Sequence, residues 1–179
     1  MQLDQLPKNV RIEGDVTNNT VIVEPSIRHI NLVITLRGSG SRVEIGPDCA
    51  LNGQLFAADG ATIRIGRRTA MLGVHVAAHE GSTVEIGERC LFSNTIRIRP
   101  SDAHKIFDIE SGLRINDQRP IVIGDEVWVG EYVQIAKGAR VGSGSIIGAT
   151  SFVSGEFPNN SLIAGSPARL LRSGVRWEP

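Results

Sequence analysis

The fold is decided by the stretch Ile123-Gly-Asp-Glu-Val-Trp-Val-Gly-Glu-Tyr-Val-Gln-Ile-Ala-Lys-Gly-Ala-Arg-Val-Gly-Ser-Gly-Ser-Ile-Ile-Gly-Ala-Thr-Ser-Phe-Val153. In it an aliphatic residue recurs every six positions, and a small residue follows each one. The aliphatic residues are Ile123, Val129, Ile135, Val141, Ile147 and Val153. A period of six fits neither the turn of a helix, about 3.6 residues, nor the plain alternation of a hairpin. It fits a chain that turns a corner every six residues, so that three hexads close one triangular coil of a parallel β-solenoid.

The same repeat continues upstream with small insertions. Similar segments run Ser41-Arg-Val-Glu-Ile-Gly46, Ala61-Thr-Ile-Arg-Ile-Gly66 and Ser82-Thr-Val-Glu-Ile-Gly87, at spacings of 20 or 21 residues. Apolar and charged residues alternate within each, which predicts strands with one face in the core and the other in water. If the six-residue spacing continues from Ile65 through Met71, the side chains of His75 and Ala77 also point into the core.

We therefore expect a single all-β domain. Its parts are irregular N-terminal coils over 1–40, coils with corner insertions over 41–98, a break at 99–120, regular coils over 121–158 and a C-terminal cap over 159–179.

Composition excludes several functions. The chain has 179 residues and a formal net charge of zero, which argues against nucleic acid or an anionic membrane surface as the main partner. The sequence shows no apolar run of 18 residues and no signal peptide at Met1, so we expect a cytoplasmic protein without membrane insertion. Cys49 and Cys90 fall in equivalent slots two coils apart. Strands stacked about 4.8 Å apart would separate them by roughly 9–10 Å, too far for a disulfide, so both are expected to be reduced core residues.

The repeat breaks once, between Ile98 and Ile123. The residues between them could form a degraded coil, or a loop extruded after a short coil, and the spacing does not decide between the two. Loops that leave a rigid scaffold often carry binding and catalytic residues.

The break and the coils around it resemble a known family. The matching motifs are Ser101-Asp-Ala-His104, Arg114-Ile-Asn116, Pro120-Ile-Val-Ile-Gly-Asp-Glu-Val-Trp-Val-Gly130, Phe157-Pro-Asn-Asn-Ser161 and Ala164-Gly-Ser-Pro-Ala-Arg169. They resemble the left-handed β-helix (hexapeptide-repeat) acyltransferases, and most of all the bacterial O-acetyltransferases that act on sugars and surface polysaccharides. The resemblance implies a left-handed parallel β-helix with a short C-terminal helical cap. It also implies transfer of an acetyl group from acetyl-CoA to a saccharide hydroxyl, in polysaccharide or capsule biosynthesis.

His104 is the candidate general base. The family has a histidine in the loop and a tryptophan 24 residues later, and His104 and Trp128 have that separation. Removing the proton of a sugar hydroxyl near neutral pH suits a neutral imidazole. Asp102 is the first candidate to orient this imidazole, as carboxylates commonly do. The other candidates for that role are Asp108, Asn116 and Asp117, and the weaker candidates for the base are His29, His75 and His79.

The resemblance also assigns a donor site. Trp128 corresponds to a tryptophan beside the pantetheine arm and thioester, and Ala149 and Ser154 to positions that line the pantetheine groove. Arg169 and Arg172 correspond to basic residues near the nucleotide phosphates, where a guanidinium is well suited. Many relatives carry a lysine where this chain has Gly155, so Lys137 or Arg140 would have to make that phosphate contact. A backbone N–H of the Gly130–Glu131 turn is the expected oxyanion donor.

Three functions stay open from the sequence. The first is the O-acetyltransferase, with no metal and with a homotrimer whose sites lie between subunits. The second is an N-acetyltransferase of a nucleotide-linked amino sugar. The third is a β-helix that is not a transferase, either a scaffold or a zinc enzyme resembling carbonic anhydrase, in which His75, His79 and His104 would have to converge. The arginines of the break region could bind an anionic sugar or form a solvated strand face: Arg97, Arg99, Arg114 and Arg119.

Overall fold

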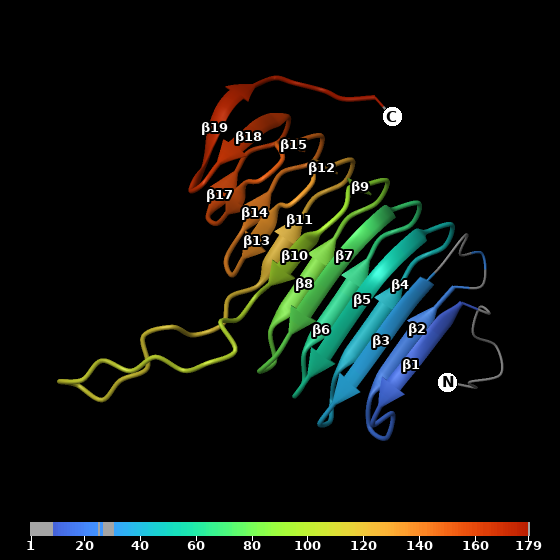
Figure 1. The fold of residues 1–179 in the computed structure, drawn as a ribbon, viewed down its shortest axis with the longest axis vertical. Helices are drawn as coiled ribbons and strands as arrows, with labels where there is room; N and C mark the ends of the chain where they lie inside the picture. The colour runs from blue at the N-terminus through green and yellow to red at the C-terminus, as the bar shows by residue number, and fades with distance from the viewer. Residues whose placement is uncertain (1–8, 25, 27–30, 179) are drawn as a thin grey trace.

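The computed structural model describes residues 9–24, 26 and 31–178, and over these residues the chain is a parallel β-solenoid (Figure 1). The all-β solenoid predicted from the repeat is confirmed. The described residues form strands, turns and loops without a helix, so none of them provides a helix that could cross a membrane. His29 lies outside the described residues.

Each complete coil places one strand on each of three faces. The first face is a seven-stranded parallel sheet. Its strands are β2 (Thr20–Val23), β4 (Arg42–Ile45), β6 (Thr62–Ile65), β8 (Thr83–Ile86), β11 (Ile121–Ile123), β14 (Arg140–Val141) and β17 (Glu156–Phe157).

The second and third faces join into one twelve-stranded sheet, because β5 (Ala50–Ala58) and β7 (Ala70–Ala78) cross the corner between them. The second face continues through β9 (Leu91–Phe92), β12 (Trp128–Val129), β15 (Ile146–Ile147), β18 (Ser161–Gly165) and β19 (Ala168–Ser173). The third face consists of β1 (Val10–Gly14), β3 (Asn31–Arg37), the later parts of β5 and β7, β10 (Ile96–Arg99), β13 (Gln134–Ala136) and β16 (Phe152–Val153).

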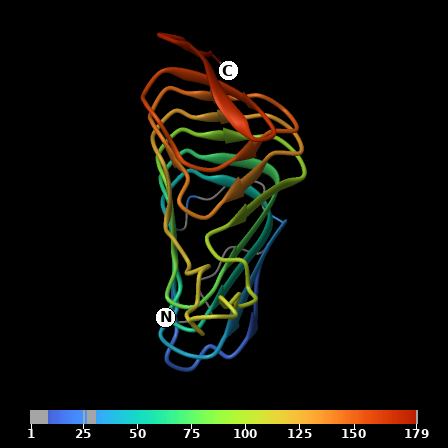
Figure 2. The same cartoon turned by 90° about the vertical axis from the view of Figure 1, so that its left-hand side faces the viewer.

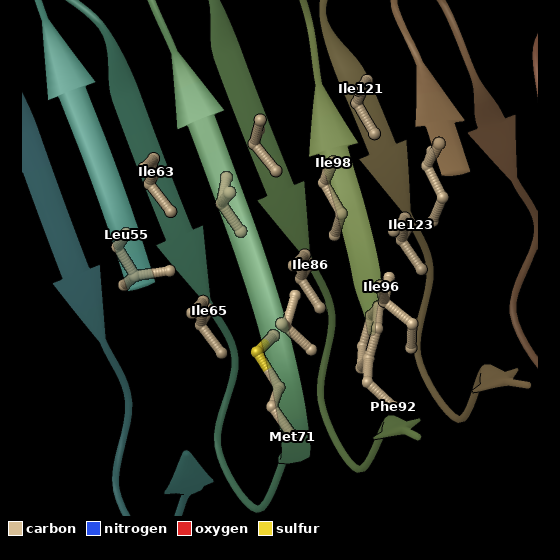
Figure 3. Packing of buried hydrophobic residues seen from close by; sticks show 14 of the residues in the cluster. Leu55, Ile63, Ile65, Met71, Ile86, Phe92, Ile96, Ile98, Ile121 and Ile123 are labelled. Carbon is tan, nitrogen blue, oxygen red and sulfur yellow. The ribbon is translucent and has the colours of Figure 1, made fainter. Parts of the chain in front are cut away.

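The aliphatic residues of the repeat form the core inside this prism. Ile65, Ile86 and Ile123 are in register on successive first-face strands and are at most 3% exposed. Figure 3 shows them side by side, pointing into the same interior. The small residue after each aliphatic is explained by close contact between coils: a Cβ on Gly124 would lie 2.6 Å from the backbone nitrogen of Ser143. Cys49 and Cys90 are buried free thiols, as expected.

The expected inward positions of His75 and Ala77 are wrong. Val74, Val76 and Ala78 point into the core instead, and His75 is half-buried on the outer surface. The register between β5 and β7 shifts after Leu51, where β7 contains one extra residue. Because side chains alternate along a strand, one extra residue moves every later side chain to the opposite face.

The expected helical cap is also wrong. Residues Ala168–Ser173 form β19, which pairs antiparallel with β18. The edge of β18 would otherwise expose a row of backbone N–H and C=O groups, and β19 satisfies them after a tight turn that begins at Gly165, whose φ is +105°.

Candidate active site

The break in the repeat is an extruded loop at the corner between the third and first faces. β10 ends at Arg99, β11 begins at Ile121, and the chain between them projects away from the solenoid in Figure 1 and toward the viewer in Figure 2. Its outer part is a hairpin, in which the Ile115 N–H donates to the Ile106 carbonyl over 2.9 Å. The loop therefore adds an arm to the solenoid without replacing a coil.

His104 lies at the base of this loop with its side chain exposed. The preceding residue, Ala103, has a φ of +64°, a left-handed conformation that residues with a Cβ rarely adopt. The His104 carbonyl accepts a hydrogen bond from Nδ2 of Asn116 over 2.8 Å. None of the described residues hydrogen-bonds the imidazole itself, so the ring extends toward solvent from a backbone that is held in place.

Asp102 does not hold His104 through the imidazole. Its Oδ2 accepts hydrogen bonds from Nζ of Lys137 over 2.6 Å and from Nδ2 of Asn116 over 2.9 Å. These bonds, with Lys137 contributing most, hold the pKa of Asp102 below its ordinary value. Since Lys137 follows β13 in the next coil, Asp102 fastens the loop to the coil on its C-terminal side.

Asn116 is the centre of the loop base and is only 7% exposed. Besides its bonds to Asp102 and His104, its Oδ1 accepts from the Ile106 N–H over 2.7 Å. One amide side chain thus connects both strands of the loop around the candidate base. Of the groups that the sequence offered for orienting His104, Asn116 is the one in contact with it, through the backbone.

Glu80 fastens the loop to the coil on its N-terminal side. Its Oε2 accepts from Nη2 of Arg114 over 2.8 Å and from Oγ of Ser101 over 3.3 Å. The bond from Arg114 is the main reason why the pKa of Glu80 is lowered. No pattern in the sequence marks Glu80, because its partners are 21 and 34 positions away and come into contact with it only when the coils stack.

The expected donor-site residues fall on different parts of the prism. Ser154 ends the third face two coils after β10, on the same corner as the loop. Gly130 and Ala149 lie at the corner between the second and third faces. Trp128, Arg169 and Arg172 lie on the second face, on β12 and β19. Within one chain, these residues are thus spread over two corners and one face of the solenoid, and only Ser154 shares a corner with the loop that carries His104.

Three contacts on the donor side were not expected from the sequence. The Gly130 N–H donates to the Ile147 carbonyl over 2.8 Å, so this N–H is not free to act as an oxyanion donor. Trp128, 39% exposed, lies beside Trp177, with ring centroids 6.2 Å apart. The Trp177 Nε1–H donates to the Glu126 carbonyl over 2.6 Å, which holds the C-terminal segment against the corner of the first and second faces.

The three described histidines, His75, His79 and His104, do not form a group that could hold a metal ion. His79 stacks on Phe56 with ring centroids 4.9 Å apart, and His75 lies on the outer surface of β7. Burial is the main cause that lowers the pKa of both imidazoles. In the part of the chain that the structure describes, no three His, Cys, Asp or Glu side chains are grouped so as to hold a metal ion.

Comparison with known proteins agrees with this fold. The family model described as "Bacterial transferase hexapeptide (six repeats)" matches residues 120–155. The polysialic acid O-acetyltransferase of Escherichia coli O1:K1 is 35% identical over 135 residues, which are 75% of this chain and 44% of that protein. The polysialic acid O-acetyltransferase of Neisseria meningitidis is 31% identical over 123 residues, 69% of this chain and 54% of that protein. The chain thus spans about half the length of these two curated relatives.

Solved structures extend the similarity over nearly the whole chain. The polySia-specific acetyltransferase NeuO matches with a TM-score of 0.89 and 36% identity, covering 95% of this chain and 72% of that one. The polysialic acid O-acetyltransferase OatWY matches with a TM-score of 0.75 and 25% identity, covering 95% of this chain and 90% of that one. The coils, the repeat and these relatives show that the chain belongs to the hexapeptide-repeat transferase family.

Proposed function

We propose that this chain transfers an acetyl group from acetyl-CoA to a hydroxyl of a saccharide, in the biosynthesis of a polysaccharide, with His104 as the general base. The observation that supports it best is the loop base, where an exposed imidazole is carried on a backbone held by Asn116 and fastened to the coils on both sides. The curated relatives of similar sequence are named as O-acetyltransferases. The proposed location of this reaction is the cytoplasm, where both acetyl-CoA and a sugar acceptor would be available.

The reaction needs one proton acceptor and one new bond. The imidazole of His104 accepts the hydroxyl proton while the sugar oxygen attacks the thioester carbonyl. The tetrahedral intermediate then collapses, the C–S bond breaks, and the sulfur leaves as the thiol after taking the proton from the imidazolium. Because the Gly130 N–H is already bonded to Ile147, the N–H of the neighbouring Glu131 is the remaining oxyanion donor in that turn.

The site residues of one chain lie on different corners of the prism, and this separation supports a homotrimer. His104 and Ser154 lie on one corner of the prism, whereas Gly130 and Ala149 lie on another. A cyclic assembly brings one corner of each copy against a different corner of its neighbour. Each complete site would then combine His104 of one copy with the donor-binding corner of the next.

The test is thiol release from acetyl-CoA with a panel of saccharide acceptors. His104→Ala should lower kcat by roughly 10²–10⁴-fold, the usual contribution of a general base, and leave the Kd for acetyl-CoA nearly unchanged. Lys105→Ala, on the adjacent exposed residue, controls for disturbance of the loop. Wild-type turnover that does not depend on any saccharide, or a His104→Ala variant as active as wild type, would refute the proposal.

A further inference from the structure

The third face of the solenoid carries a cationic patch beside the loop, which we define as Gln54, His75, Arg97 and Arg99. The first three are outward residues in one row, since Gln54 pairs in register with His75, and His75 with Arg97. Adjacent members of such a row lie roughly 4.8 Å apart. Arg99 lies two residues after Arg97 on β10 and points to the same side.

The two outward rows that contain this patch hold no acidic residue from β3 to β16. One row is Val33, Gln54, His75, Arg97, Gln134 and Phe152. The other includes Thr35, Phe56, Ala77, Arg99 and Ala136. Among the described residues, Arg97 and Arg99 have no carboxylate within 4.0 Å.

On the first face of the same solenoid, by contrast, arginines are paired with glutamates. There Arg64 bridges two coils by bonding Glu44 over 2.7 Å and Glu85 over 3.1 Å, and Arg67 bonds Glu88 over 2.8 Å. Such pairs neutralise charge along the stack of coils. Since the repeat offers the same strand geometry on both faces, the lack of acidic partners is a property of the third face. Its guanidinium groups are left able to bind an anion from outside.

The patch also has a shape that suits a sugar ring. A hollow of about 260 Å³ is lined by Gln54, His75 and Arg97 together with Gly53 and Gly73. Gly53 is required there, because its φ is +146° and a Cβ would lie 2.0 Å from the Val74 carbonyl oxygen. The neighbouring amide, imidazole and guanidinium side chains offer donors and acceptors to hydroxyl groups as well as positive charge.

The patch leads directly to the candidate base, since Arg99 is five residues before His104 on the strand that runs into the loop. We infer that the third face binds the acceptor as a saccharide bearing a carboxylate, with Arg97 and Arg99 holding the carboxylate and Gln54 and His75 contacting the sugar. This inference rests on the proposed function for its role in acetyl transfer. Planar guanidinium groups match a carboxylate with two parallel hydrogen bonds, which gives the acceptor a fixed orientation.

The experiment compares two single variants with a matched control. Arg97→Gln and Arg99→Gln each remove one unpaired charge from the patch, and Arg64→Gln removes the same charge from the first face. Oligogalacturonate and oligosialate serve as probes, each beside its neutral counterpart with the carboxyl groups reduced. Direct binding is measured by calorimetry at low salt, and acetyl transfer by thiol release.

Wild type should bind the acidic oligosaccharides at least about tenfold more tightly than the neutral ones. Arg97→Gln and Arg99→Gln should each weaken acidic binding by about tenfold or more, since a hydrogen bond to a charged group is worth at least about 1.5 kcal/mol and about 1.4 kcal/mol is a factor of ten. Binding of the neutral probes, and all binding by Arg64→Gln, should change less than about twofold.

The inference is overturned if wild type does not prefer the acidic probes, if it binds none of them, or if Arg64→Gln loses as much affinity as the patch variants. Its failure is distinguishable from failure of the proposed function. Acetyl transfer to neutral saccharides that is unaffected by the patch variants would support the proposed transferase function and refute the role of the patch in acceptor binding. Arginine-dependent binding of acidic saccharides without any acetyl transfer would support the patch as a binding site and refute the transferase function.

Discussion

Replacing Asn116 with alanine should disable the loop without unfolding the solenoid. The change removes four hydrogen bonds: the amide donates to the His104 carbonyl over 2.8 Å and to Asp102 over 2.9 Å, and accepts from the Ile106 N–H over 2.7 Å and from Nε of Arg114 over 3.4 Å. The bond from Arg114 is long and adds little to the sum. Two neutral bonds contribute about 1 kcal/mol each and the bond to the carboxylate at least about 1.5 kcal/mol. Water entry and non-additivity reduce the sum to roughly 2–3 kcal/mol of local stability.

That loss makes local opening of the loop base roughly 30–150-fold more frequent, at about 1.4 kcal/mol per factor of ten. Amide hydrogen exchange at 104–116 should accelerate by this factor. Turnover should fall by roughly 10²-fold, because a displacement of the base by about 1 Å is enough for such a loss. The free energy of global unfolding should stay nearly constant, since the core residues Ile98 and Ile121 that flank the loop keep their contacts and are both fully buried.

The assays are hydrogen exchange by mass spectrometry, urea unfolding and thiol release, each run on Asn116→Ala and on Asn52→Ala. Asn52 is an exposed asparagine at a corner of the solenoid, and its amide bonds the Leu72 carbonyl over 2.9 Å. Its replacement should leave turnover and loop exchange unchanged. The reasoning is refuted if Asn116→Ala keeps turnover within about threefold of wild type with normal exchange in the loop, or if it lowers global stability by the full local amount.

Two further predictions concern pH and assembly. Asp102 and Glu80 have their pKa lowered, chiefly by hydrogen bonds from Lys137 and Arg114, so their contribution to loop stability is present above the unfolded carboxyl pKa of about 4 and is lost as pH falls through the lower folded pKa. The carboxyl carbon NMR resonances of Asp102 and Glu80 should therefore stay constant from about pH 7 to 5 and move only below about pH 4; a midpoint for either carboxyl group near pH 6 would contradict this assignment. Co-refolding inactive copies that carry His104→Ala with inactive copies that carry Trp128→Ala should restore activity at about a quarter of the sites in an equal mixture. No recovery would indicate that each copy forms its site alone.

The coils were predictable because the repeat itself encodes which residues point inward. Ile123 and Val141, one coil apart in the repeat, are neighbours in register on the first face. The bulge in β7 was not predictable, because coils of 20 and 21 residues both close and the spacing does not show where the extra residue lies. The winding hand came from the family resemblance, since a six-residue period is compatible with either hand.

The C-terminal strand β19 could not be predicted for a different reason. The family resemblance implied a helical cap there, and Leu170, Leu171 and their arginine neighbours do have good helix propensity. The open edge of β18 supplied backbone partners for a strand, and this tertiary contact overrode the local preference.

The candidate site was predictable in its residue types and not in its contacts. His104 and Asp102 stand out in the sequence because they interrupt a regular pattern. The partners that hold them come from other coils: Lys137 is 35 positions from Asp102, and Glu80 is 34 positions from Arg114. Such contacts depend on the stacking distance of the coils and on the path of an inserted loop, and neither is written in the local sequence.

The loop is inserted between two strands whose pairing with the next coil does not depend on it. β10 pairs with β13 and β11 pairs with β14, so the strands on either side of the loop continue their sheets as though the chain between them were absent. A longer, shorter or unrelated arm at this corner would require no new core. The arm can therefore change in length or sequence without altering the pairing of the later coils, to which the proposed function assigns the nucleotide of acetyl-CoA.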